Sequence, residues 1–128
     1  MLPLCAAEGI VVIPWSPQAR GKLSRDRDYT SLRTETDEAM TRLFANTEEA
    51  DMKVADRVGE VAKVRGVPRA QIALAWLLAK PMITAPIVGA TKLHHLDDAL
   101  ASVSVRLSAD EIAALEEPYV PHTVVGFV

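Results

Sequence analysis

The sequence predicts an α/β fold that is mostly helical and contains two parallel strands. Two short apolar runs rich in β-branched residues, at positions 10–13 and 83–88, are typical of strands buried on both faces of a parallel sheet. About 70 residues separate the runs, and a connection of that length implies a crossover through helices. Two parallel strands alone would each keep an unpaired edge, so further strands must come from elsewhere or the chain is a fragment.

Composition narrows the class of protein. The 128 residues have the length of one domain or a piece of one, and 49% apolar with 24% charged residues indicates a globular chain. A net charge of −3, with both signs interspersed, argues against a nucleic-acid partner, and the longest apolar run, residues 72–79, is too short for a membrane span. The single Cys5 excludes an internal disulfide and fits a cytoplasmic protein, and the adjacent His94 and His95 lack zinc-ligand spacing.

The first part of the chain reads as a helix end, a strand and a long loop. Residues 1–8 are expected to end a helix that closes at Gly9, and the first apolar run follows. Residues 20–41 are polar and lack a sustained period, which predicts a loop, with a helical turn over residues 39–44.

Two helices are expected next. Glu48–Arg65 carries an apolar stripe that includes Val54, Val58 and Val61, with Thr47 as its cap and Gly66 at its end. Pro68 opens a helix over residues 69–79 that is apolar nearly all round, so most of its sides should be buried.

The second apolar run leads into a turn and another helix. Apolar residues at helical spacing follow Leu93, and Asp97 and Asp98 are expected in the first turn. A strand, a Gly turn and a helix N-terminus form a recurrent anion site, where Thr91 would offer a hydroxyl and Lys92 a cation to a phosphate. An ordinary tight turn at Gly89 is the alternative, and the pattern alone favours that alternative.

A last short helix is predicted by the capping box of Ser108 and Glu111, and it carries Ile112 and Leu115 on its apolar side. Pro118 ends this helix, and residues 119–128 are expected to form an extended tail.

Four segments, in order and spacing, resemble the aldo-keto reductase family across almost the whole chain. Residues 13–23, Ile-Pro-Trp-Ser-Pro-Gln-Ala-Arg-Gly-Lys-Leu, resemble its Trp-Ser-Pro-Leu-Ala-x-Gly-x-Leu segment, and residues 70–78 resemble its Ala-Gln-x-Ala-Leu-Ala-Trp helix. Residues 86–92, Pro-Ile-Val-Gly-Ala-Thr-Lys, are similar to its last strand and nucleotide loop, and residues 107–115 to its C-terminal helix.

The resemblance implies a (β/α)8 TIM barrel that binds an extended NADPH or NADH and reduces aldehydes or ketones to alcohols. Residues 10–13 would be strand seven and residues 83–88 strand eight, so residues 1–128 would form the C-terminal portion of the oxidoreductase domain. In such barrels phosphate sites gather on the loops after strands seven and eight. The possible anion site at Thr91 and Lys92 would lie on the second of these loops.

The resemblance also implies roles for ten residues. Trp15 would stack on the nicotinamide, and Ser16, Gln18 and Gly21 would hold the pyrophosphate. The loop around the adenosine ribose and its 2′-phosphate would consist of Gly89, Ala90, Thr91 and Lys92, and the residues reaching the ribose and adenine would be His95 and Asp98. Lys92 makes NADP the preferred cofactor, with NAD possible. Without the family, Trp15 could equally be a packing residue at a barrel rim, and solvated helix-start residues are the commoner role for His94 and His95.

No catalytic residue is predicted in this chain. The family's catalytic Tyr, Lys, Asp and His come from the first half of the barrel, and no segment here resembles them. Tyr119 has no Lys or Asp nearby in sequence to tune it as a proton donor. We therefore expect much of the cofactor site without the catalytic tetrad, and no activity toward a small-molecule carbonyl by the 128-residue chain alone. The alternative is a non-catalytic nucleotide-binding or scaffold fragment that pairs with itself or a partner through exposed sheet edges.

Overall fold

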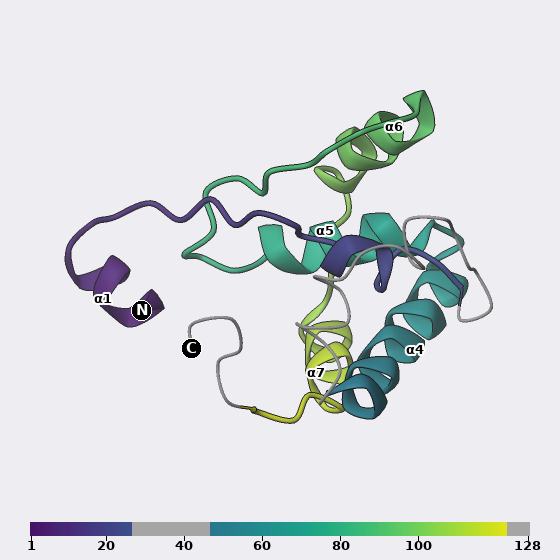
Figure 1. Ribbon diagram of the computed structural model, residues 1–128, viewed down its shortest axis with the longest axis horizontal. Coiled ribbons are helices and arrows are strands. Elements are labelled where there is room, and N and C mark those ends of the chain that lie inside the picture. Colours follow the sequence, from purple (N-terminus) through teal and green to yellow (C-terminus); the bar gives the residue numbers. More distant parts are fainter. Residues whose placement is uncertain (27–46, 123–128) are drawn as a thin grey trace.

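The computed structural model describes residues 1–26 and 47–122. Their helical elements are α1 (Leu2–Ala7), the 3-10 turn η1 (Ala19–Gly21), α4 (Glu48–Arg65), α5 (Arg69–Leu78), α6 (Leu93–Ser102) and α7 (Ala109–Glu116) (Figure 1). The predicted helical turn over residues 39–44 and most of the predicted loop over residues 20–41 lie outside the described residues. None of the helices in the described ranges is long and apolar enough to cross a membrane.

The core lies where α4, α5 and α7 meet. Val58, Val61 and Ala62 of α4 pack with Ile72 of α5 and Leu115 of α7, and all five are buried. Figure 1 shows α5 across the middle of the molecule, with α4 and α7 beneath it. The apolar stripes read from the sequence therefore face one another, and their burial supplies the main stabilisation of this part of the chain.

The boundaries of α4 and α5 follow local signals. Gly66 closes α4 at φ +66°, a left-handed conformation in which a glycine lacks the steric penalty of a side chain, and Pro68 stands at the N-cap of α5. The predicted Thr47 cap was right in position and wrong in chemistry. Its hydroxyl donates to Asp51 Oδ2 at 2.7 Å, and its oxygen accepts no capping bond from a backbone amide of the first turn.

Ion pairs fasten α7 to the rest of the bundle. Arg65 Nε donates to Glu111 Oε1 at 2.6 Å, and the capping box of Ser108 and Glu111 is formed as predicted. At the other end of α7, Trp76 Nε1 donates to Glu116 Oε1 at 2.9 Å, and Lys80 pairs with the same carboxylate. Trp76 is half-buried and packs against the core cluster.

The two apolar runs lie side by side as extended segments. They are joined by parallel bridges between Val12 and Ile83 and between Trp15 and Ile87. Thr84 N donates to Val12 O and Ile87 N to Pro14 O, both at 2.9 Å. The parallel direction agrees with the prediction, whereas two isolated bridges do not establish the predicted count of two strands.

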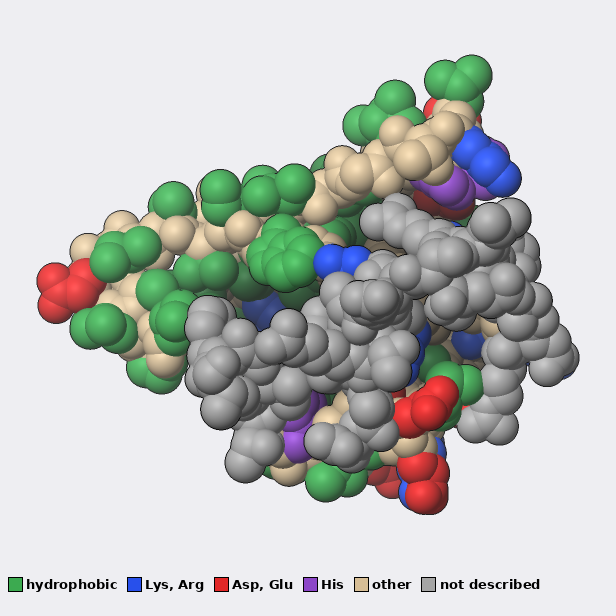
Figure 2. Space-filling view, viewed as in Figure 1, with side chains coloured by type: hydrophobic (Ala, Val, Ile, Leu, Met, Phe, Trp, Pro, Cys, Tyr) green, Lys and Arg blue, Asp and Glu red, His purple; other side chains and the backbone are tan. Residues whose placement is uncertain are grey.

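The prediction that these runs are buried on both faces was wrong for this chain. Val11 is 68% exposed, Ile13 56% and Ile87 53%, and hydrophobic side chains lie at the surface along the extended segments (Figure 2). Among the described residues each run has only the other as a bridge partner, and a parallel sheet needs further strands and covering helices to bury its faces.

Helix α6 packs against α5, and Gln71 Nε2 donates to Asp98 Oδ1 across their contact at 2.9 Å. The prediction that Asp97 and Asp98 lie in its first turn was wrong, because α6 already begins at Leu93 and its first turn holds the two histidines. Its apolar side is largely exposed, with Leu96 at 47% and Leu100 at 63%.

Candidate functional site

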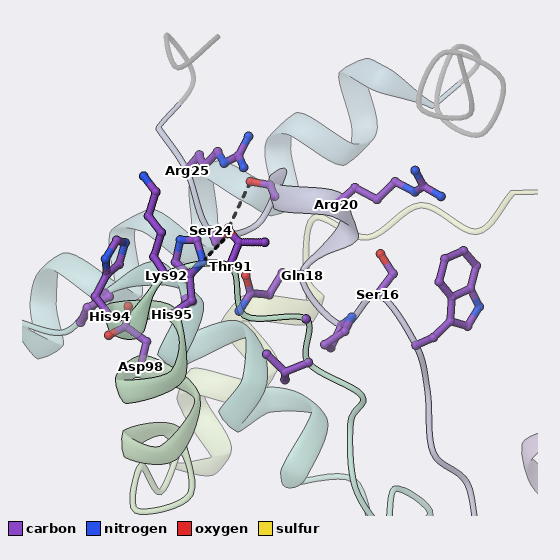
Figure 3. Close-up of a pocket in the computed structure, with 17 residues that line it drawn as sticks. Ser16, Gln18, Arg20, Ser24, Arg25, Thr91, Lys92, His94, His95 and Asp98 are labelled. Carbon is purple, nitrogen blue, oxygen red and sulfur yellow. Dashed lines mark hydrogen bonds between the residues drawn. The ribbon is translucent and has the colours of Figure 1, made fainter. Parts of the chain in front are cut away.

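A cavity of about 760 Å³ opens where two loops and two helix starts converge. One wall is the loop that follows the first extended segment, residues 15–25, and the opposite wall is residues 88–92 with the start of α6. Pro68 and Ala70, at the start of α5, also line it. Figure 3 shows the labelled side chains of the two walls around the cavity. The parallel bridges place both loops at the same end of the extended segments, which is why residues about 70 positions apart share one cavity.

Nine of the ten residues that were predicted to bind a cofactor line this cavity. They are Trp15, Ser16, Gln18, Gly21, Gly89, Thr91, Lys92, His95 and Asp98. The tenth, Ala90, is not among the lining residues, although it belongs to the same loop. The structure thus brings the predicted set together, and the role of each residue toward a nucleotide stays a prediction.

The wall formed by residues 15–25 has an unusual backbone. Ser16, Ala19 and Arg20 have φ values of +54°, +47° and +56°, a region that side-chain-bearing residues seldom adopt. The turn is held by backbone bonds from Gly21 N to Gln18 O at 2.9 Å and from Ala19 N to Ser16 O at 3.0 Å. Strained non-glycine positions of this kind cluster at ligand sites.

Gly21 makes room for an arginine in this wall. Its φ is +103°, and a Cβ there would lie 3.0 Å from both Cζ and Nε of Arg25. A glycine is therefore needed both for the backbone angle and for the approach of the guanidinium.

The opposite wall presents the start of α6. Lys92 occupies the N-cap position and makes no side-chain capping bond to the helix amides. Thr91 Oγ1 lies 3.4 Å from His95 Nδ1, and the rings of His94 and His95 meet edge to face at 4.4 Å. The positive end of a helix, a hydroxyl and a lysine therefore face the cavity together, which suits an anion.

The charge balance of the lining was only partly predicted. Arg20 and Arg25 line the cavity as well as Lys92, and Asp98 is the one carboxylate among the described lining residues. Ser24 and His94 also line it and were not in the predicted set. Arg20 directly precedes Gly21 and Arg25 follows it four residues later, but the sequence around them lacks a period that would predict where their side chains point. For a metal, the described residues contain no group of three or more suitable ligands.

Comparison with known proteins identifies relatives over nearly the whole chain. The sequence model of the Aldo/keto reductase family matches residues 1–119. A versiconal hemiacetal acetate reductase of Aspergillus parasiticus is 44% identical over 97% of this chain, which covers 36% of that protein.

Two solved structures have the same fold over this region. A thermostable aldo-keto reductase, crystallised with the inhibitor epalrestat, aligns with a TM-score of 0.61 and 27% identity over 91% of this chain and 32% of its own. The glycerol dehydrogenase of Gluconobacter oxydans aligns with a TM-score of 0.70 and 22% identity over 97% of this chain and 39% of its own. The chain thus spans a little over one third of the curated relative's length.

Proposed function

Because the chain belongs to the aldo/keto reductase family, we propose that it supplies the dinucleotide-binding part of an NAD(P)H-dependent carbonyl reductase. The proposed reaction of the complete enzyme is reduction of a small aldehyde or ketone to an alcohol. The versiconal hemiacetal acetate reductase and the other relative named as a reductase are consistent with this reaction class. We propose the cytoplasm as its location, on the single half-buried Cys5.

The observation that carries the proposal is the shared cavity. Trp15 on one loop and Lys92 on the other line the same space, as one extended ligand that touches both would require. Its volume of about 760 Å³ is that of a small-molecule site, and its described lining includes Arg20, Arg25 and Lys92, cationic side chains of the kind that bind phosphate.

Each wall has a part in the proposed binding. Trp15 is 66% exposed at the cavity and offers an aromatic face to the nicotinamide. Ser16, Gln18 and Gly21 would hold the pyrophosphate, and Thr91, Lys92, His95 and Asp98 the adenosine end. When bound, the reduced nicotinamide supplies the hydride for the carbonyl carbon. The residues of this chain bind and orient the dinucleotide.

We propose NADP as the preferred cofactor. Figure 3 shows Arg25 and Lys92 on the same side of the cavity, away from Arg20, so two cations can meet one additional phosphate. Calorimetric titration with NADPH and NADH tests this preference. Lys92→Met should weaken the binding of NADPH by about tenfold, because one charged contact is lost, and should change the affinity for NADH little.

Lys53→Met is the matched control, because Lys53 is an exposed lysine of α4 that pairs with Glu49 and does not line the cavity. If the unmodified chain binds neither nucleotide, the proposal fails. If both lysine variants weaken NADPH equally, the effect is one of net charge and the site is not at Lys92.

The proposal includes no catalysis by this chain alone. Carbonyl reduction needs a positioned acid to protonate the oxygen, and we assign none among the cavity residues. Incubation of the 128-residue chain with NADPH and a small aldehyde should give no NADPH oxidation above the rate without protein. Oxidation that depends on the protein would overturn this part of the proposal.

A second candidate function is favoured by the exposed apolar runs. Val11, Ile13 and Ile87 are each more than half exposed on segments whose outer edges have no bridge partner among the described residues. Such edges suit a non-catalytic nucleotide-binding fragment that pairs with a second copy or a partner chain. A stable soluble dimer that binds nucleotide, seen by size-exclusion chromatography with light scattering, would support this candidate, and a monomer would count against self-pairing.

A further inference from the structure

We propose that Arg20 selects the redox state of the nicotinamide, favouring the reduced dinucleotide over the oxidised one. The inference rests on the proposed function, because it takes Trp15 as the platform for the nicotinamide ring. It concerns a residue that the sequence patterns did not single out and that lines the same cavity.

The first observation is the contact between Arg20 and Trp15. The guanidinium carbon of Arg20 lies over the indole, 5.7 Å from the ring centroid. Figure 3 shows Arg20 extending to the opposite end of the cavity from Arg25 and Lys92. One cation is thus separated from the other two and placed at the aromatic platform.

The second observation is the backbone that aims this side chain. Arg20 has φ +56° and follows Ala19 at φ +47°, within the short turn η1. Backbone bonds from Gly21 N to Gln18 O at 2.9 Å and from Lys22 N to Ala19 O at 3.2 Å hold the turn. Because this conformation is unfavourable for residues with a side chain, the direction of Arg20 is imposed by the fold.

The chemistry of the ligand gives this charge a consequence. The oxidised nicotinamide ring carries a positive charge, and hydride addition makes it neutral. An indole face alone attracts the cationic ring. The Arg20 guanidinium lies over one face of the indole, and its charge opposes the attraction of a cationic ring to the other face while acting little on the neutral ring. Oxidised cofactor would then be released more readily after reduction.

The size of the effect follows from Coulomb's law. We take a separation of roughly 8 Å between the guanidinium and the oxidised ring and an effective dielectric constant between about 80 and 20. The repulsion then weakens binding of the cationic ring by about twofold to thirtyfold. Salt shortens the range of this interaction, so the effect should shrink as ionic strength rises.

The dissociation constants of NADPH and NADP⁺ test the inference. Arg20→Met, which keeps most of the side-chain length, should lower the ratio of the NADP⁺ dissociation constant to the NADPH dissociation constant by about twofold to thirtyfold at low salt. Arg20→Lys should keep the ratio, and Lys53→Met should leave both constants unchanged. An unchanged ratio in Arg20→Met would overturn the inference. The proposed function would still stand in that case, provided that the chain binds the nucleotides.

A second measurement separates the inference from the proposed function. Quenching of Trp15 fluorescence by free nicotinamide, which is neutral, is compared with quenching by the cation 1-methylnicotinamide, and the Trp15→Phe variant gives the signal of Trp76 to be subtracted. Arg20→Met should increase quenching by the cation and not by the neutral molecule. If both quenchers respond equally to the substitution, the inference is wrong whether or not the dinucleotides bind.

Discussion

Replacement of Gly59 by alanine tests the packing between α4 and α5. A Cβ at this position would lie 2.4 Å from Arg69 Cζ and 2.5 Å from both terminal nitrogens, so the guanidinium must move. In its present place Arg69 Nη1 donates to the backbone oxygen of Ala55 at 2.8 Å, and Nη2 pairs with Asp26 at 3.0 Å.

The two consequences of Gly59→Ala oppose each other. Alanine in a helix interior gains about 1 kcal/mol over glycine. Displacement of the arginine loses a charged hydrogen bond of about 1.5–3 kcal/mol, and the pair with the largely exposed Asp26 adds little. We therefore expect Gly59→Ala to destabilise the chain by about 1 kcal/mol.

In an Arg69→Ala background the obstacle is gone, and the same substitution should stabilise by about 1 kcal/mol. Urea unfolding of the four proteins, followed by circular dichroism, gives the interaction free energy, expected near 2 kcal/mol. Additive effects, or stabilisation by Gly59→Ala in both backgrounds, would refute the packing argument.

Three further predictions concern the core, the site wall and pH. Leu115→Ala removes a side chain that is 4% exposed between α4 and α5, and should cost about 2–5 kcal/mol in urea unfolding, against less than about 1.5 kcal/mol for Leu115→Met. Gly21→Ala and Gly66→Ala both place a side chain at positive φ, but only the first crowds Arg25. Only Gly21→Ala should therefore weaken the binding of NADPH in calorimetry. An equal loss of affinity in both variants would mean that backbone strain alone causes the effect. Arg65, and then the Ser108 amide, lower the pKa of Glu111 from 4.5 to about 2. The stability that this carboxylate contributes is therefore present above pH 4.5 and is lost as the pH falls toward 2. Glu111→Gln should flatten that part of the dependence of unfolding free energy on pH, and an unchanged dependence would contradict the assignment.

Signals confined to neighbouring residues were read correctly from the sequence. The bounds of α4 match the prediction because Gly66 and Pro68 act within one turn, and the Ser108 box depends on residues three apart. Asp97 and Asp98 were placed one turn too early in α6 because its N-cap is Lys92, whose side chain makes no capping bond and therefore leaves no signature in the sequence.

Burial and cavity lining depend on residues far apart in the chain. The runs at residues 10–13 and 83–88 have the composition of buried strands, yet whether they are buried depends on neighbours that the described residues do not include. The sequence did not predict where the side chains of Arg20 and Arg25 point, because the positive-φ turn around η1 sets the course of the backbone there. Nine of the predicted site residues did converge, as the resemblance to the family implied, whereas the residue pattern alone had pointed only to the turn with Gly89, Thr91 and Lys92.

The central claim is that one dinucleotide contacts both loops, and titration of the ¹⁵N-labelled chain with NADPH tests it directly by NMR. The amides of Ser16 and Gly21 on one loop and of Gly89 and Thr91 on the other should shift together, with a single dissociation constant. Shifts confined to one loop, or two loops that report different constants, would contradict the claim.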